Sequence, residues 1–300
     1  MIRHLLGIRD FSREEIEAIL KSAEELRGKR EPILKDRIMA ALFFEASTRT
    51  RFSFESAMLR LGGGILSTEN GLQSSSAVKG ETLEDTARIV SGYADIIVVR
   101  HPEEGAAKRV AAYSRVPVIN AGDGGSEHPT QTLTDLSTIM RERGSIDGLS
   151  VAFVGDLKNG RTVKSLLRSL ALFRDVQVTL VSPVGLQLPE AIMSELSGSL
   201  HLSVVSDLLP VISLVDVIYQ TRIQKERFTD PGEYEKYKSC YRIDRELAQK
   251  MKRESLLMHP LPRIDEIAPD VDDLPQAAYF RQAENGVSVR MALLHFLLAQ

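Results

Sequence analysis

Short apolar runs that alternate with longer helical stretches constrain the fold of this chain most. The run from Ile96 to Val99 is apolar at every position, which suits a strand buried on both faces. Six further runs of this kind occupy residues 38–44, 116–119, 151–154, 176–181, 217–219 and 256–258. Apolar residues at helical spacing occupy 48–61, 82–93, 103–113 and 130–143. The alternation predicts an α/β fold of doubly wound parallel sheets.

The length and the spacing of these runs predict two domains. A chain of 300 residues is about two domains long. The helical stretch at 130–143 ends at Gly144-Ser145, after which the alternation starts afresh. We expect domains at 1–135 and 136–284, linked by helices, with a C-terminal helix at 285–300 that packs back on the first domain. Its apolar part, residues 287–299, is too short to cross a bilayer.

Composition excludes several classes of protein. The formal net charge is -3, so nothing in the overall charge favours a nucleic-acid partner. The single cysteine, Cys240, excludes an internal disulfide and a cysteine zinc cluster. The first ten residues contain no apolar core of a signal peptide, and no apolar stretch is long enough for a membrane span. We therefore expect a cytoplasmic protein that binds neither nucleic acid nor membrane.

An anion site is predicted where the run at 38–44 enters the next helical stretch. Ser47 falls at or near the helix N-cap, and Thr48, Arg49 and Thr50 fall in the first turn. Free backbone N–H groups, hydroxyls and a guanidinium then converge on one point, which suits a phosphate. The alternative is an ordinary capped helix with solvated arginines. Two arginines, Arg49 and Arg51, are unfavourable in a first turn without an anion, so we favour the phosphate site.

Two further candidates follow the next strands. Arg100 comes directly after the run that ends at Val99, where the carboxyl ends of parallel strands face a ligand crevice. A glycine-rich loop then carries His128 and Gln131 into the next helix. No metal-ligand spacing surrounds His128, so its imidazole is a hydrogen-bond donor or an acid/base group.

The segment Gly155-Asp-Leu-Lys-Asn-Gly-Arg161-Thr162 resembles a P-loop in which arginine replaces the lysine. A nucleotide hydrolase is therefore an alternative function, although the lysine and a magnesium-binding aspartate are missing. A dinucleotide-binding turn is disfavoured because G-x-G-x-x-G is absent. Arg161 and Thr162 at a helix start fit an anion other than a polyphosphate.

Two late clusters follow the last predicted strands. Thr221-Arg222-Ile-Gln224-Lys-Glu-Arg227 follows the run that ends at Tyr219, and His259-Pro260-Leu261-Pro262-Arg263 follows the run that ends at Met258. The prolines on each side of Leu261 fix the backbone, so carbonyl groups there can face a ligand amine or amide. A rigid surface turn is the alternative reading of this segment.

Taken together, these segments resemble the aspartate/ornithine carbamoyltransferase family over nearly the whole chain and in the same order. The matching motifs begin at Ser47, Ser75, Arg100, His128, Gly155, Arg222 and His259. The last motif favours the aspartate branch of the family, because the ornithine branch resembles His-Cys-Leu-Pro where this chain has His259-Pro-Leu-Pro.

The resemblance implies transfer of the carbamoyl group of carbamoyl phosphate to the amine of L-aspartate, a step of pyrimidine biosynthesis. It implies that carbamoyl phosphate is bound by Ser47, Thr48, Arg49, Thr50, Ser75, Lys79, Arg100, His128, Gln131, Pro260 and Leu261. It implies that aspartate is bound by Lys79, Arg161, Thr162, Arg222 and Gln224. Arg49, Thr50, Arg100 and His128 would be catalytic, and no metal or organic cofactor is required. The first domain would bind carbamoyl phosphate and the second aspartate.

The resemblance also implies an assembly. Ser75 and Lys79 match a loop that family members donate from a neighbouring subunit, which implies a homotrimer with shared sites. Glu45 could pair with Arg161 or Arg227 when the domains close around substrate. The sequence leaves open whether separate regulatory chains bind, which group accepts the amine proton, and whether Glu127 raises the pKa of His128. An ornithine acceptor and a catalytically silent anion-binding subunit are further alternatives.

Overall fold

The computed structural model describes residues 2–74, 76–125, 127–228, 230–238 and 240–299. The chain divides into two compact units, Met1–Ser137 with Asn285–Gln300, and Thr138–Glu284. The strands are β1 (Ile38–Phe43), β2 (Gly64–Thr68), β3 (Ile96–His101), β4 (Val118–Asp123), β5 (Ser150–Val154), β6 (Gln177–Val181), β7 (His201–Val205), β8 (Val217–Gln220) and β9 (Leu256–Met258). The helices are α1 (Arg13–Glu25), α2 (Thr48–Arg60), α3 (Gly71–Ser74), α4 (Leu83–Val90), α5 (Ala106–Tyr113), α6 (Pro129–Arg143), α7 (Arg161–Leu170), α8 (Glu190–Leu196), α9 (Pro231–Tyr237), α10 (Arg245–Ala248) and α11 (Tyr279–Leu298).

Each unit contains one parallel sheet, which confirms the predicted fold class. The first sheet has the strand order β2-β1-β3-β4, and the second has the order β7-β6-β5-β8-β9. In the first sheet the chain changes direction across β1 and β3, and in the second across β5 and β8. Ligands of open α/β sheets bind beside the carboxyl ends of such a pair, because the following loops diverge there.

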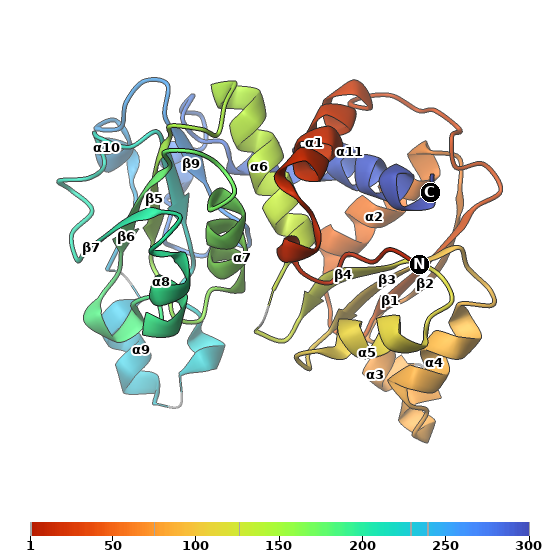
Figure 1. The fold of residues 1–300 in the computed structure, drawn as a ribbon. Coiled ribbons are helices and arrows are strands. Elements are labelled where there is room, and N and C mark those ends of the chain that lie inside the picture. The colour runs from red at the N-terminus through yellow and green to blue at the C-terminus, as the bar shows by residue number, and fades with distance from the viewer. Residues whose placement is uncertain (1, 75, 126, 229, 239, 300) are drawn as a thin grey trace. The chain divides into compact units, whose positions relative to one another are not determined.

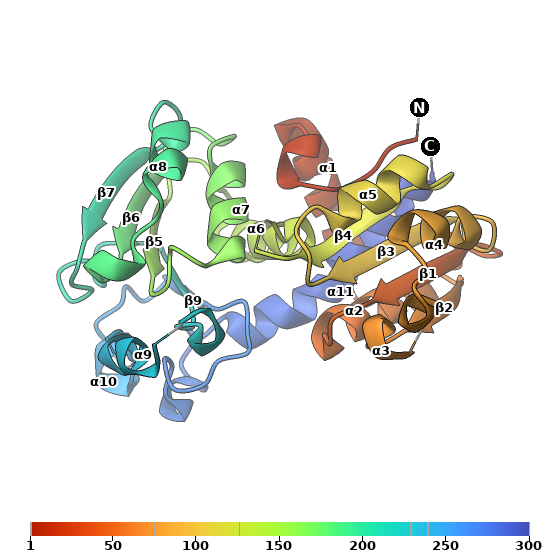
Figure 2. The same ribbon diagram turned by 90° about the horizontal axis from the view of Figure 1, so that it is seen from below.

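Helices cover both faces of the first sheet. Figures 1 and 2 show α4 and α5 on one face and α2 and α11 on the other. Alanine side chains of α4 and α5, such as Ala87 and Ala107, pack with Ile97 and Val99 of β3. In the second unit, Ile218 of β8 and Leu257 of β9 pack with residues of the segment from Leu208 to Val215 and with Ile243. Strands buried in this way require apolar side chains on both faces, as the sequence shows.

Two of the edge strands, β2 and β7, were not predicted. Both are only partly buried, so neither forms a continuous apolar run. The predicted start of the last helix at residue 285 was also wrong. The helix α11 begins at Tyr279, well before the apolar part of the segment. Its first turns carry the polar residues Arg281 and Gln282, which hide the helix from a search for apolar periodicity.

None of the helices in the described part of the chain is long and apolar enough to span a membrane.

Candidate active site

Ser47 to Thr50 lie at the carboxyl end of β1, at the switch point of the first sheet. Ser47 is the N-cap of α2, as predicted, but within the described chain its side chain makes no capping hydrogen bond. Thr48 is exposed, whereas Thr50 is buried. The cap therefore leaves N–H groups of the first turn available to an anion.

Arg49 and Arg51 differ in their surroundings. Arg51 is paired with carboxylates, at 2.8 Å from Glu69 and 3.7 Å from Glu55. Arg49 is exposed and has no ion pair or hydrogen bond with any residue that the structure describes. The prediction that both arginines need an external anion was thus wrong for Arg51. Of these two arginines, Arg49 is the one without a compensating carboxylate among the described residues.

Arg100 lies within β3 rather than after it, because the strand continues to His101. Its side chain is buried, and Nη1 donates to the carbonyl oxygen of Ala121 at 3.3 Å. Nε lies 3.1 Å from Oε2 of Glu45, the residue that leads from β1 toward α2. Arg100 is thereby held at the carboxyl end of the strand next to β1.

His128 and Gln131 lie at the start of α6, after β4. The imidazole of His128 is buried, and its Nδ1 lies 3.3 Å from Oγ1 of Thr130. The amide Nε2 of Gln131 donates to Oδ1 of Asp135 at 2.7 Å. The carboxylate of Glu127 accepts a hydrogen bond from the backbone N–H of Ile8 at 2.9 Å, so it ties the loop to the N-terminal segment.

In the second unit, the turn from β5 to α7 holds Arg161 and Thr162. Both are the first residues of α7, and Gly160 is its N-cap. Asp156 fixes the turn, because its carboxylate accepts hydrogen bonds from the backbone and side-chain N–H groups of Asn159. The guanidinium and the hydroxyl are therefore both placed at a helix N-terminus.

Arg222 and Gln224 follow β8, the neighbour of β5, and are partly buried. The loop is anchored by Thr221, whose hydroxyl donates to the carbonyl oxygen of Val154 at 2.9 Å. Arg161 and Arg222 thus come from the two strands at the switch point of the second sheet. Two arginines there are suited to a ligand with two carboxylates, because each guanidinium can bind one through two hydrogen bonds.

A buried histidine shapes the segment with Pro260 and Leu261. The Nδ1 atom of His259 accepts from the N–H of Leu261 at 2.8 Å, and its Nε2 lies 2.8 Å from Oε1 of Glu266. Because Nδ1 accepts, the proton is on Nε2. Burial lowers the pKa of His259 more strongly than Glu266 raises it. Burial opposes ionisation of Glu266 too, but hydrogen bonds from His259 and the backbone hold its pKa below the ordinary value.

Leu261 has a φ of 52°, and a cis peptide bond joins it to Pro262. That the carbonyl groups of this segment face a ligand stays a prediction.

The remaining predicted residues are Ser75 and Lys79. Ser75 lies outside the described residues. Lys79 ends the short 3-10 helix Ser76–Lys79, and its side chain is exposed with no partner among the described residues.

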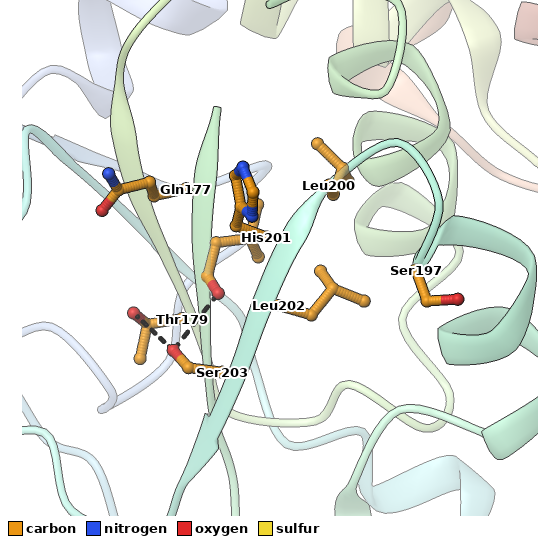
Figure 3. Close-up of a pocket in the computed structure, with 8 residues that line it drawn as sticks. Gln177, Thr179, Ser197, Leu200, His201, Leu202 and Ser203 are labelled. Atoms are coloured by element: carbon orange, nitrogen blue, oxygen red, sulfur yellow. Dashed lines mark hydrogen bonds between the residues drawn. The ribbon is translucent and has the colours of Figure 1, made fainter. Parts of the chain in front are cut away.

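A pocket of 440 Å³ lies elsewhere, at the amino ends of β6 and β7 (Figure 3). His201 and Gln177 line it, together with a hydroxyl pair in which Ser203 donates to Thr179 at 3.1 Å. Arg161 and Arg222 follow the carboxyl ends of their strands, at the opposite edge of this parallel sheet. None of the residues that line the pocket is a predicted site residue.

Known proteins match the chain over its full length. Residues 3–141 match the carbamoyl-P binding domain of aspartate/ornithine carbamoyltransferase, and residues 147–297 match the Asp/Orn binding domain. The chain belongs to the aspartate/ornithine carbamoyltransferase family. The aspartate carbamoyltransferase catalytic subunit of Methanocaldococcus jannaschii is 54% identical over 99% of this chain and 98% of that protein.

Solved structures of this carbamoyltransferase family agree with that assignment. The catalytic subunit of M. jannaschii aspartate transcarbamoylase covers 99% of this chain and 98% of its own, with 51% identity and a TM-score of 0.93. Aspartate transcarbamoylase from Trypanosoma cruzi, in complex with carbamoyl phosphate and aspartate, covers 97% of this chain and 95% of its own, with 40% identity and a TM-score of 0.92. The enzyme class implied by the motifs is confirmed.

Some residues of this carbamoyltransferase hold the predicted site residues in place and were not themselves predicted in that role. Glu45 lies against Arg100 in the structure, and its pairing across domains on closure around substrate stays a prediction. Asp135 follows Gln131 by one helical turn and accepts its amide. The spacing of four residues on a predicted helix was the available signal for that contact.

Proposed function

We propose that this chain transfers the carbamoyl group of carbamoyl phosphate to the amine of L-aspartate, giving N-carbamoyl-L-aspartate and phosphate. The observation that carries the proposal is the 54% identity, over nearly the full length, to an aspartate carbamoyltransferase catalytic subunit. Arginines at the switch points of both sheets support it, because the two substrates together carry a phosphate and two carboxylates.

The first unit binds carbamoyl phosphate in this proposal. Ser47, Thr48, Arg49, Thr50 and Arg100 bind the phosphate. His128 and Gln131 bind the carbamoyl group, with Pro260 and Leu261 contributed by the second unit. A phosphate that reaches Arg100 competes with Glu45 for the guanidinium, which lies 3.1 Å from that carboxylate.

The second unit binds aspartate through Arg161, Thr162, Arg222 and Gln224. Thr162 and Gln224 add uncharged donors to the two guanidinium groups, so the site can orient both carboxylates of the substrate. Fixed orientation of the amine toward the carbamoyl carbon supplies much of the rate, because it replaces an encounter of two free molecules.

The reaction forms one bond and breaks another. The neutral amine attacks the carbamoyl carbon to form the C–N bond, and the electron pair moves onto the carbonyl oxygen. Thr50, Arg100 and His128 stabilise that oxyanion. The C–O bond to phosphate then breaks, and the departing phosphate accepts the proton that the nitrogen loses.

Ornithine is the alternative acceptor within the family. Phosphate release from carbamoyl phosphate should be measured with aspartate, with ornithine and with ATP as separate co-substrates. We expect release that depends on aspartate, with N-carbamoyl-L-aspartate as the product. Activity with ornithine alone would refute the proposal, and hydrolysis of ATP would favour the P-loop alternative.

We also propose a homotrimer whose sites are shared between subunits, with Ser75 and Lys79 donated by a neighbour. Exposed apolar side chains in the first unit support an interface there: Leu59 of α2, Leu66 of β2, Leu72 of α3 and Val78 beside Lys79. Arg49→Ala and Lys79→Ala chains, each nearly inactive at the carbamoyl phosphate concentration that half-saturates the wild type, should regain activity at that concentration when mixed, because some sites then receive neither substitution. No recovery after proven subunit exchange would contradict shared sites.

We place the enzyme in the cytoplasm, in pyrimidine biosynthesis, which consumes carbamoyl aspartate. The lone Cys240 supports this location, since the fold uses no disulfide that a reducing compartment would break. The mass of the purified complex distinguishes a free trimer from trimers joined to separate regulatory chains.

A further inference from the structure

The side-chain amide of Gln131 is hydrogen-bonded to a buried carboxylate, that of Asp135. Asp135 lies one turn further along α6 and is fully buried. Its Oδ1 accepts from Nε2 of Gln131 at 2.7 Å. A buried carboxylate is unfavourable unless hydrogen bonds or an opposite charge compensate it.

The opposite charge comes from α11. Arg290 is buried, and its Nη1 donates to the carbonyl oxygen of Gly286 at 2.9 Å and to Oγ1 of Thr134 at 3.5 Å. Its guanidinium lies over the ring of Phe54, 5.0 Å from the centroid. Burial lowers the pKa of Arg290 to about 10, and the charge of Asp135 acts in the opposite direction. The group therefore remains a cation at neutral pH.

Position 286 provides the space for this buried cation. A Cβ atom on Gly286 would lie 2.3 Å from Nη1 of Arg290. The glycine thus lets the guanidinium lie against its own helix. All of these residues belong to the same compact unit.

The hydrogen bond to Asp135 determines how Gln131 is oriented. An ionised carboxylate only accepts hydrogen bonds, so Gln131 must direct its NH₂ group toward Asp135. Its carbonyl oxygen Oε1 is then the polar atom left for a ligand. A carbonyl oxygen accepts from an amide NH₂ and gains nothing from a methyl group.

We propose that Asp135 and Arg290 are positioning residues that fix Gln131 as an acceptor for the carbamoyl NH₂. They thereby make the enzyme select carbamoyl phosphate over acyl phosphates with a methyl group in that place. This inference rests on the proposed function, because it assumes that Gln131 meets the carbamoyl group.

The first test compares two donors in Asp135→Asn. Asparagine can donate to Oε1 of Gln131, which an ionised carboxylate cannot do, so the amide is no longer restricted and can turn its NH₂ group toward the substrate NH₂. We expect the KM for carbamoyl phosphate to rise about 10- to 100-fold, as for a lost hydrogen bond with a misplaced donor. The inhibition constant of acetyl phosphate should change by less than about twofold, because its methyl group makes no such bond. Equal loss for both compounds would overturn the proposal.

Two variants control for damage to the helix. Ser137→Ala changes a buried residue of the same helix and should leave both constants unchanged. Gln131→Ala should lose affinity for carbamoyl phosphate, and adding Asp135→Asn to it should cause no further loss. A further loss in the double variant would show that Asp135 does not act through Gln131.

Gln131→Glu provides a test that leaves the buried pair intact. The new carboxyl faces Asp135, with Arg290 and His128 as the other charged or titratable groups at this turn. When protonated, it donates to Asp135 and its carbonyl oxygen still faces the ligand. When ionised, it is repelled by the carboxylate of Asp135. The KM for carbamoyl phosphate, divided by the wild-type value at each pH, should rise with pH. A ratio independent of pH would count against the inference.

The assays separate the two proposals. Wild-type enzyme without aspartate-dependent carbamoyl transfer would refute the proposed function. Active wild-type enzyme whose Asp135→Asn variant keeps its preference for carbamoyl phosphate over acetyl phosphate would refute only the positioning role.

Discussion

Arg49 and Arg51 lie near the same end of α2 but differ in their partners, which predicts a binding role for Arg49 and a structural role for Arg51. Both follow the N-cap Ser47, yet Arg51 is compensated by Glu69 and Glu55, whereas Arg49 has no partner among the described residues. An arginine left uncompensated at a helix N-terminus opposes the helix dipole. Arg49 therefore costs stability in the free enzyme and is available to an anionic substrate.

Arg49→Ala should raise the KM for carbamoyl phosphate about 100-fold, because a charge-assisted hydrogen bond to the phosphate is lost. The midpoint of thermal unfolding should not fall, since no described residue loses a partner. Arg51→Ala is the matched control and should do the reverse, with a nearly unchanged KM and a loss of less than about 1 kcal/mol of stability. A lower unfolding temperature in Arg49→Ala alone would contradict this division.

Protonation of His259 is expected to make the stability of the folded protein depend on pH. Burial lowers its pKa below the ordinary value of 6.5, so the unfolded chain binds this proton more readily than the folded one. Stability from this group is complete above the unfolded pKa and decreases as pH falls below it. The lowered pKa of Glu266 acts in the same direction at more acidic pH.

His259→Asn should reduce the loss of stability between about pH 7.5 and about pH 5.5. The asparagine oxygen can still accept from the N–H of Leu261, which His259 binds at 2.8 Å, but the side chain cannot titrate. Unfolding midpoints of both proteins, measured across this range, test the prediction. Parallel curves would show that His259 does not carry the acid sensitivity.

The turn between β5 and α7 is the element that decides where Arg161 points. Gly155 has a φ of 114°, and a Cβ atom there would lie 2.6 Å from the carbonyl oxygen of Thr221. The backbones of the β5 and β8 loops thus approach too closely for any side chain. This approach brings the loops with Arg161 and Arg222 together.

Gly155→Ala should destabilise the protein by about 3 kcal/mol, because strain at positive φ adds to the overlap with Thr221. It should also raise the aspartate concentration for half-maximal rate, since the loops must separate. Gly148→Ala is the control, with a φ of 77° and no atom within 4 Å of an added Cβ. It should cost about 1 kcal/mol and leave aspartate saturation unchanged. Equal effects of the two substitutions would show that the close approach is unimportant.

For the whole molecule, the hypothesis that the units close around substrate makes a prediction about Glu45. Its carboxylate lies beside Arg100, the residue proposed to bind phosphate. A phosphate with two negative charges competes for that guanidinium and releases Glu45. If the units close around substrate, the released carboxylate would pair with Arg161 or Arg227, which is the hypothesis drawn from the sequence. Both α6 and α11 contain residues of both units, so they are the segments that such a closure would bend.

Glu45→Ala should therefore affect the two substrates in opposite ways. Binding of carbamoyl phosphate should be unchanged or tighter, because a competing anion is removed, while the aspartate concentration for half-maximal rate should rise. Glu103→Ala removes a surface carboxylate that pairs with Arg109, and it should change neither. An unchanged aspartate saturation curve in Glu45→Ala would reject the pairing.

The sequence by itself determined much of this protein. Buried strands can be recognised in the sequence because both of their faces must be apolar. The edge strands β2 and β7 could not be found this way, since they are only partly buried, whereas the edge strands β4 and β9 are buried and were found. The order of motifs was enough to indicate the family.

Only the tertiary structure decided which charges are compensated. Arg51 forms an ion pair with Glu69, and Arg100 forms one with Glu45. The charge of Asp135 acts on Arg290, although the two residues are far apart in sequence. The sequence lists such charges but not their distances, and electrostatic energy depends on distance and burial. The switch points that group the candidate binding residues also arise from strand order, which the packing of the sheets fixes.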